Sequence, residues 1–112
     1  MHFLLDVAGA PFATLDDPVL VETLLVDAVK AIGAKVLGIH IHKQVPQGVT
    51  GVVVSSESHL TIHTWPERGE AAVDLFTCGD VAQARAAVEA LAWALGATES
   101  AVEERVRGVG PR

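Results

Sequence analysis

The sequence predicts an α+β fold, a two-layer sandwich whose mainly antiparallel sheet carries two helices on one face. Half of the 112 residues are apolar and a fifth are charged, as in globular domains. Most apolar segments are short and bounded by turn-forming residues, as strands are, and only two stretches repeat apolar residues at helical spacing. The length suits one compact domain, so we expect a single domain over residues 1–112.

A first helix is predicted between a strand at residues 2–7 and a strand at residues 35–42. It begins at Asp16-Asp17-Pro18, because Asp side chains cap free N–H groups and Pro suits the first helical position. Gly33 ends it, since glycine readily adopts the conformation that terminates a helix. Its apolar stripe consists of Val21, Leu24, Leu25, Ala28 and Ile32.

Three strands are predicted in the centre of the chain, over residues 49–55, 60–64 and 71–77. The first is rich in β-branched residues and follows a break at Pro46-Gln47-Gly48. A turn over residues 67–70 separates the second strand from the third. This spacing is typical of a sheet built from antiparallel neighbours.

A second helix is predicted to begin after Asp80, with Gln83 placed to complete a capping box. Gly96 ends this helix, and residues 100–106 predict a last strand. The apolar stripe of the helix consists of Val81, Ala84, Val88, Leu91 and Leu95.

Charge and composition exclude several classes of partner. The net charge of −6 argues against nucleic acid and suits a cationic small-molecule substrate. The single cysteine, Cys78, cannot form an internal disulfide. The first residues lack the basic region and long apolar run of a signal peptide or membrane span. We therefore expect a cytoplasmic protein with neither a membrane nor a nucleic acid as partner.

Reactive side chains are concentrated between Thr50 and Cys78. The run Ser55-Ser56-Glu57-Ser58-His59 interrupts an apolar strand pattern, and His63, Trp65 and Glu67 follow it. Hydroxyls, imidazoles, a carboxylate and a thiol could all face one cleft. Composition alone favours an ordinary strand junction, because serine is common in turns.

The order of these residues favours a functional site over an ordinary strand junction. Three segments carry a long and specific pattern: residues 48–54 (GVTGVVV), 56–67 (SESHLTIHTWPE) and 71–79 (AAVDLFTCG). This pattern resembles the bacterial and archaeal S-adenosylmethionine decarboxylase proenzymes, a pyruvoyl-dependent family. Weaker similarity extends over nearly the whole chain, from His2 to about Arg107. The resemblance implies decarboxylation of S-adenosylmethionine for polyamine (spermidine) biosynthesis.

The resemblance also implies that the chain cuts itself between Glu57 and Ser58. The Ser58 hydroxyl would attack the Glu57 carbonyl to form an ester, and loss of the Ser58 α-proton would expel the Glu57 carboxylate. Hydrolysis of the resulting dehydroalanine would leave ammonia and a pyruvoyl group, the covalent cofactor. The products would be a β chain of residues 1–57 and an α chain of residues 58–112.

Further roles follow from the same resemblance. His63 would remove the α-proton, Thr50 would hold the ester, and Cys78 would protonate the product carbanion. The chemistry is consistent, because the pyruvoyl carbonyl supplies an electron sink and a thiol with a pKa of about 8.5 is a suitable acid. Trp65 and Glu67 would bind the substrate, by cation–π contact with its sulfonium and by hydrogen bonds to its ribose.

The spacing of Ser58 and His63 raises a geometric question. They are five residues apart, so in a regular strand their side chains face opposite ways. The implied roles therefore require a turn or bulge between them, or a serine that moves once the chain is cut.

Two segments depart from the family pattern. Gln44 stands where the family commonly has an aromatic residue thought to stack on adenine, and Ala8-Gly9-Ala10 replaces a Tyr-Gly-Cys type of turn. Loss of the stack would remove about 1–3 kcal/mol of adenine binding. Because only substrate-contact positions differ, a pyruvoyl-dependent arginine or ornithine decarboxylase is the alternative function.

A metal-binding protein is an alternative of another class. His40 and His42 lie on one face of a predicted strand, at a spacing that zinc can use. His59, His63 and Cys78 could add ligands, whereas a pyruvoyl enzyme needs no metal. A relative that has lost processing is a further alternative, against which the intact Glu57-Ser58 pair argues.

A homo-oligomer is also expected, at least a dimer of processed α/β pairs. A sheet with helices on one face only is predicted to leave its other face apolar, and a second copy is the simplest cover for it.

Overall fold

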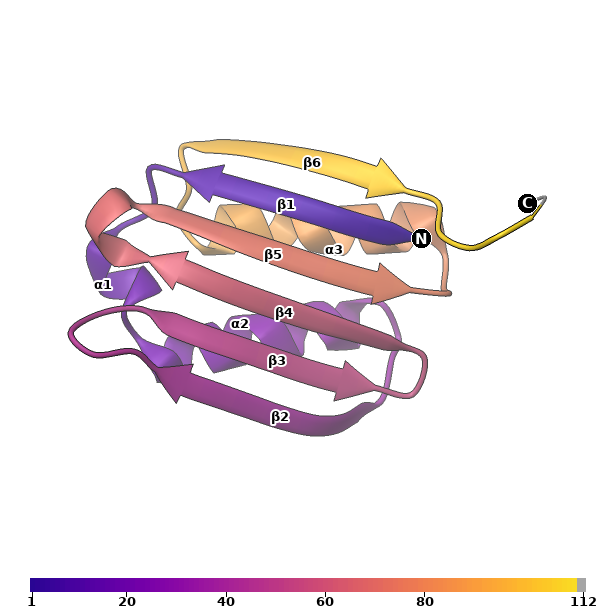
Figure 1. Ribbon diagram of the computed structural model, residues 1–112, viewed down its shortest axis with the longest axis horizontal. Helices are drawn as coiled ribbons and strands as arrows, with labels where there is room; N and C mark the ends of the chain where they lie inside the picture. Colours follow the sequence, from indigo (N-terminus) through magenta and orange to yellow (C-terminus); the bar gives the residue numbers. More distant parts are fainter. Residues whose placement is uncertain (111–112) are drawn as a thin grey trace.

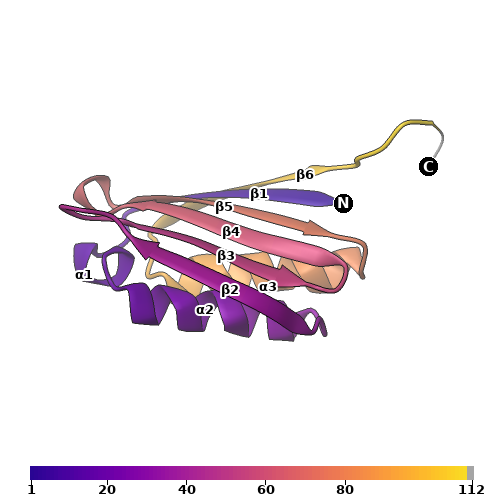
Figure 2. The same cartoon turned by 60° about the horizontal axis from the view of Figure 1, so that its bottom comes forward.

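Residues 1–110, which the computed structural model describes, form a six-stranded antiparallel sheet with two long helices on one face (Figure 1; Figure 2). The strands are β1 (His2–Ala8), β2 (Val36–Lys43), β3 (Val49–Ser55), β4 (Ser58–Trp65), β5 (Glu70–Thr77) and β6 (Glu99–Arg105). The helices are α1 (Phe12–Leu15), α2 (Pro18–Ala31) and α3 (Val81–Ala94), with a 3-10 turn η1 (Pro66–Arg68). The predicted α+β sandwich is confirmed. Within these residues no helix is long and apolar enough to cross a membrane.

The order of strands across the sheet is β2-β3-β4-β5-β1-β6. Although β1 begins the chain, it lies between β5 and β6 and pairs antiparallel with both (Figure 1). Strands from the two halves of the chain are therefore interleaved in one sheet.

The core lies between the sheet and the two long helices. Side chains from α2, α3 and alternate strand positions fill it, among them Phe3, Leu5, Val21, Leu25, Leu60, Ile62, Val73, Val88 and Leu91. At Gly51 a Cβ atom would lie 2.8 Å from Ile41 Cδ1 and 3.1 Å from Leu25 Cδ1. The glycine therefore allows α2 to pack closely on β3.

Both long helices begin at their predicted caps. The Asp17 carboxylate accepts hydrogen bonds from the N–H groups of Val19 and Leu20, and Pro18 occupies the first helical position. At α3 the prediction is half wrong. Asp80 accepts from the Gln83 N–H, but the Gln83 side chain donates to the Ala31 carbonyl at 3.0 Å and does not return to Asp80. Carbonyls at the end of a helix lack internal partners, so the end of α2 competes for this amide.

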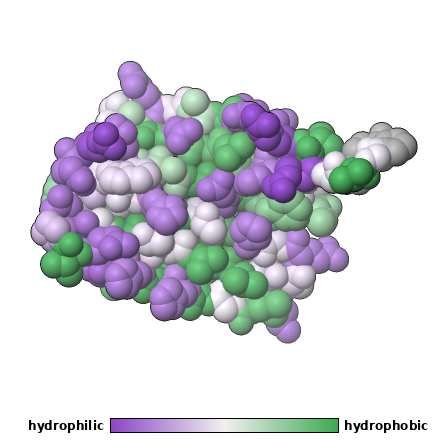
Figure 3. All heavy atoms as spheres, viewed as in Figure 1, coloured by the Kyte–Doolittle hydropathy of each residue, from purple (hydrophilic) through white to green (hydrophobic). Residues whose placement is uncertain are grey.

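The face of the sheet away from the helices is open and mixed in character (Figure 3). The prediction of an apolar face is wrong, because alternate strand positions bring histidines, threonines and acids to this side together with apolar groups. Side chains on this face include His2, Leu4, His42, Thr50, Val52, Val54, His59, Thr61, His63, Trp65, Asp74 and Phe76.

Candidate functional site

The predicted site residues divide between the two ends of β4. Ser58 begins this strand and is buried on the helix side, whereas His63 is exposed on the open face. Pairing with β5 runs without a register shift from Ser58 opposite Thr77 to Trp65 opposite Glu70. The five residues from Ser58 to His63 span roughly 17 Å in a regular strand. No turn or bulge brings the two together, so within one chain the implied roles would require a serine that moves once the chain is cut.

The first cluster is the connection between β3 and β4, the serine hairpin, which comprises Ser55, Ser56, Glu57 and Ser58. Ser56 and Glu57 are exposed, whereas Ser55 is 6 % and Ser58 8 % exposed. The Ser55 hydroxyl donates to the Ser58 carbonyl at 3.0 Å, and the two Oγ atoms share a second hydrogen bond. The Glu57–Ser58 peptide bond thus joins an exposed carboxylate to a buried hydroxyl.

Cys78 belongs to the same end of the sheet. Thr77, the residue before it, lies opposite Ser58 in the β4–β5 ladder. The Thr77 Oγ1 accepts from the Gly79 N–H at 3.1 Å, and the Met1 ammonium donates to the Thr77 carbonyl at 3.0 Å. These contacts hold the turn that carries the exposed Cys78 thiol beside the serine hairpin.

The second cluster is a pocket of about 300 Å³ at the other end of β4, the histidine pocket. It brings together Thr50, His63, Trp65 and Glu67, four of the predicted site residues. The complete lining is Gln44, Val45, Gln47, Thr50, His63, Thr64, Trp65 and Glu67.

Hydrogen bonds and ring contacts order this pocket. His63 Nδ1 lies 3.2 Å from Thr50 Oγ1, which also accepts a hydrogen bond from the Gln44 side-chain amide at 3.1 Å. The His63 and Trp65 rings stack with centroids 6.4 Å apart. Trp65 is 39 % exposed, so part of its ring is open to a ligand. In the sequence Gln44 stands out only as the absence of an aromatic residue, and nothing there indicates its hydrogen bond to Thr50.

The walls of the pocket are fixed by buried and partly buried polar groups. Thr64 Oγ1 donates to the Leu15 carbonyl and accepts from the Val49 N–H, each at 2.8 Å. One oxygen of Asp16 accepts from the Gly48 N–H and from the Lys43 ammonium, each at 2.9 Å. The Gly48 and Lys43 hydrogen bonds lower the pKa of the Asp16 carboxyl below its ordinary value. In the sequence Asp16 looks like part of a helix cap. Nothing there indicates that its carboxylate binds Gly48 of the 44–48 loop.

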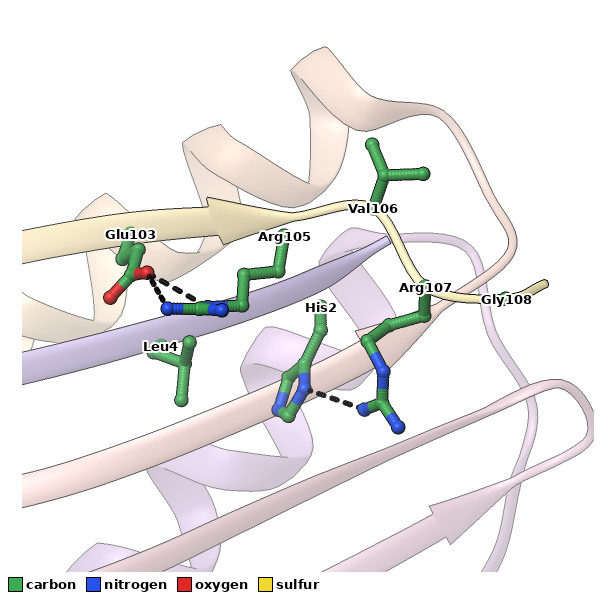
Figure 4. Close-up of a pocket in the computed structure, with 7 residues that line it drawn as sticks. All are labelled: His2, Leu4, Glu103, Arg105, Val106, Arg107 and Gly108. Carbon is green, nitrogen blue, oxygen red and sulfur yellow. Dashed lines mark hydrogen bonds and ion pairs between the residues drawn. The ribbon is translucent and has the colours of Figure 1, made fainter. Parts of the chain in front are cut away.

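A larger, shallow hollow of about 640 Å³ lies over β1 and β6 (Figure 4). Within it Arg107 Nη1 lies 3.2 Å from His2 Nδ1, and His2 Nε2 lies 3.2 Å from Asp74 Oδ1. None of the predicted site residues lines this hollow.

Metal ligation finds no support in the geometry. Within residues 1–110 no group of three or more His, Cys, Asp and Glu side chains is arranged to hold a metal ion. His40 and His42 lie on β2, and Cys78 follows β5.

Comparisons with known proteins agree on one family. The model of the S-adenosylmethionine decarboxylase family matches residues 1–108. An S-adenosylmethionine decarboxylase proenzyme from Caldanaerobacter subterraneus is 50% identical over 108 residues, which are 96% of this chain and 87% of that protein. One from Methanococcus maripaludis is 56% identical over 79 residues, 70% of this chain and 65% of the relative.

A solved structure extends the likeness to the fold. The crystal structure of the adenosylmethionine decarboxylase from Aquifex aeolicus is 34% identical in sequence and superposes with a TM-score of 0.82. The match covers 99% of this chain and 95% of the Aquifex aeolicus chain. A family match over residues 1–108, together with identity of 50% over almost the full length, leaves one conclusion. The chain belongs to the S-adenosylmethionine decarboxylase family.

Proposed function

We propose that this chain is a self-processing, pyruvoyl-dependent decarboxylase that converts S-adenosylmethionine to its decarboxylated form for spermidine biosynthesis. The observation that carries the proposal is the serine hairpin. In a chain of this family, the buried Ser58 follows the exposed Glu57 directly, and the Cys78 turn lies beside this pair.

Ser58 supplies both the nucleophile and the cofactor. Its Oγ attacks the Glu57 carbonyl carbon, the Glu57–Ser58 C–N bond breaks, and the hydroxyl proton ends on the released amine. Removal of the Ser58 α-proton then expels the Glu57 carboxylate, and hydrolysis releases ammonia. Residue 58, at the start of β4 and opposite Thr77, would carry the group that is left, which would supply a carbonyl electron sink for decarboxylation.

The sheet topology supports a processed enzyme whose two pieces stay together. Residues 1–57 provide β1, β2 and β3, and residues 58–112 provide β4, β5 and β6. Because β1 lies between β5 and β6 and β3 pairs with β4, the pieces share three ladders. Cleavage opens one hairpin and leaves these ladders intact.

The separation of Ser58 from His63 favours a dimer with shared sites. Two copies that face each other through their open sheet faces, with strands running in opposite directions, place the histidine pocket of one beside the serine hairpin of the other. Two-fold symmetry then produces two equivalent sites. The exposed Val54, together with the partly exposed Val52 and Phe76, gives such a contact apolar area to bury.

Within each shared site the chain's own side chains divide the work. A hydroxyl has two lone pairs, so Thr50 can accept from both the Gln44 amide and the His63 Nδ1–H. The Nε2 of His63 is then free to take the α-proton of the partner's residue 58. Trp65 and Glu67 contact the sulfonium and ribose of the substrate. The exposed Cys78 thiol donates a proton to the substrate α-carbon once carbon dioxide has left.

Denaturing mass spectrometry of the purified protein tests self-cleavage. We expect residues 1–57 and a 58–112 fragment that is lighter by one ammonia than its serine form. Ser58→Ala should stay full-length and inactive, which makes it the matched control. A wild-type chain that remains a single full-length species after long incubation would contradict the proposal.

A side-by-side assay with carboxyl-labelled substrates tests the choice of substrate. We expect carbon dioxide from S-adenosylmethionine far faster than from arginine or ornithine. Release from either basic amino acid, with none from S-adenosylmethionine, would overturn the substrate and leave the self-cleavage chemistry in place.

A further inference from the structure

We infer that Ser55 is a positioning residue for self-cleavage, because its hydroxyl holds the attacking hydroxyl of Ser58 in place. The inference rests on the proposed function in one respect, that Glu57–Ser58 is the bond cut. It assigns Ser55 a part in the first step, formation of the ester.

The two serines meet at the end of the β3–β4 ladder. Ser55 ends β3 and Ser58 begins β4, and the last residue pair of this ladder is Val54 with His59. Beyond that pair the Ser55 side chain makes hydrogen bonds to the Ser58 carbonyl, at 3.0 Å, and to the Ser58 Oγ. Both serines are more than nine-tenths buried. Water therefore competes little for these bonds, and the orientation of the Ser58 hydroxyl is set by its neighbour.

Proton counting assigns a direction to the contact between the two hydroxyls. A serine hydroxyl has one proton and two acceptor lone pairs. If the Ser55 proton is donated to the Ser58 carbonyl, the bond between the two Oγ atoms must be made by the Ser58 proton. Ser58 then donates to the Ser55 oxygen, and the lone pairs of the Ser58 oxygen remain free to attack the Glu57 carbonyl carbon. Such a bond fixes the Ser58 rotamer and raises electron density on the oxygen that attacks.

A purely structural role for Ser55 predicts different behaviour. In that case the bond to the Ser58 carbonyl would only close the hairpin, and its loss would lower stability without changing the rate of ester formation. A positioning role predicts slower cleavage even in a variant that is well folded. The two roles are separated by measuring cleavage and folding independently.

The test follows cleavage of freshly purified precursor on denaturing gels for Ser55→Ala, Ser55→Val and Ser55→Thr. We expect Ser55→Ala and Ser55→Val to slow cleavage by about tenfold or more, the loss of one hydrogen bond to a reacting group. Ser55→Thr keeps the hydroxyl and should stay within a few-fold of wild type. Ser100→Ala, at an exposed serine on β6, is the matched control and should cut normally.

Two further measurements identify the step and the fold. Hydroxylamine cleaves esters, so Ser55→Val should yield little hydroxylamine-dependent fragment, whereas a variant blocked at elimination should yield much. Melting temperatures of the Ser55 variants in the uncut Ser58→Ala background report folding separately. If Ser55→Ala unfolds, the near-isosteric Val and Thr variants still decide the question.

Equal cleavage rates for Ser55→Val and Ser55→Thr would overturn the inference, as would accumulation of ester in Ser55→Val. Failure of the wild-type chain to cut would instead overturn the proposed function. The two failures are therefore distinguishable in one experiment.

Discussion

The serine hairpin and the histidine pocket contrast in almost every physical respect, although one strand connects them. In the hairpin, the hydroxyls of Ser55 and Ser58 are buried against the helix side of the sheet. In the pocket, His63 and Trp65 are exposed on the open face beside a space of about 300 Å³. The first region is built to hold one bond in one geometry, and the second is built to admit a ligand.

This contrast teaches how a small domain can carry demanding chemistry. Each end of β4 carries part of the proposed set of groups, with the proposed nucleophile and thiol at one end and the proposed base and aromatic surface at the other. A single chain of this length cannot fold both ends onto one another, because the strand between them is straight and regularly paired. A two-fold dimer needs no additional residues to complete the set twice.

The largest expected effect comes from mixing two inactive variants. Ser58→Ala alone should remain uncut, and His63→Ala alone should stall at an ester that hydroxylamine cleaves. When the two chains are co-assembled, the His63→Ala chain should mature, because its Ser58 meets the His63 of the Ser58→Ala chain. Mass spectrometry of the mixture measures this recovery.

The control for that experiment is His63→Ala mixed with a chain that carries both substitutions. No recovery is expected there, since neither partner supplies a histidine. If mixed dimers form and still fail to mature, Ser58 and His63 act within one chain and the contrast between the two regions loses its functional meaning.

Cys78→Ala should separate turnover from cleavage. The exposed thiol lies beside the hairpin and is assigned to protonation of the product, so turnover should fall by about 10²–10⁴-fold, the usual contribution of a general acid. Fragment formation should proceed at close to the normal rate. Fragments on gels and carbon dioxide release measure the two quantities separately, and normal turnover would remove Cys78 from this role.

Sequence alone predicted the fold well, because alternation and caps are local signals. Residues 49–55 were assigned to a strand with the observed bounds. The predicted start of β4 is two residues too late, because Ser58 and His59 are polar and do not continue the apolar pattern of the strand. The short helix α1 was also missed, because four residues carry no helical period.

The sequence supplies the candidate site residues, whereas their arrangement depends on the fold. Glu57, Ser58 and Cys78 share one end of the sheet, and Thr50 and His63 share the other, as long-range strand register dictates. Register depends on which strands pair, and no local pattern states that. For the same reason the contacts of Ser55, Asp16 and Thr64, which join residues brought together by folding, left no signal in the sequence.

A moderate effect is expected from Gln44→Phe in the histidine pocket. The new ring would offer adenine a stacking surface close to Trp65, worth at most about 1–3 kcal/mol. The Gln44 bond to Thr50 would be lost at the same time, which offsets part of the gain. We therefore expect the KM for S-adenosylmethionine to fall several-fold in steady-state assays, while the serine hairpin cuts as before. An unchanged or higher KM would show that adenine does not stack at position 44.

The smallest effect concerns Asp16, which holds the 44–48 loop over the pocket. Asp16→Asn keeps the shape and removes the charge that attracts the Lys43 ammonium at 2.9 Å. We expect KM to rise about two- to threefold, the scale of an exposed ion pair, with cleavage at Glu57–Ser58 unchanged. Asp17→Asn is the matched control, since Asn is an equally good helix cap and Asp17 does not touch the loop.

The pH dependence of this loop has a definite sign. The hydrogen bonds from Gly48 and then Lys43 lower the pKa of folded Asp16 below its ordinary value of about 3.8. Because the pKa is lowered, the stabilisation from the carboxylate is complete when the pH is above the ordinary pKa. It is lost only as the pH falls through the lowered pKa of the folded state. The KM ratio of Asp16→Asn to wild type should therefore stay constant from about pH 5 to 8, where the Asp16 carboxylate remains ionised. A ratio that changed within that window would assign the loop's stability to a different titrating group.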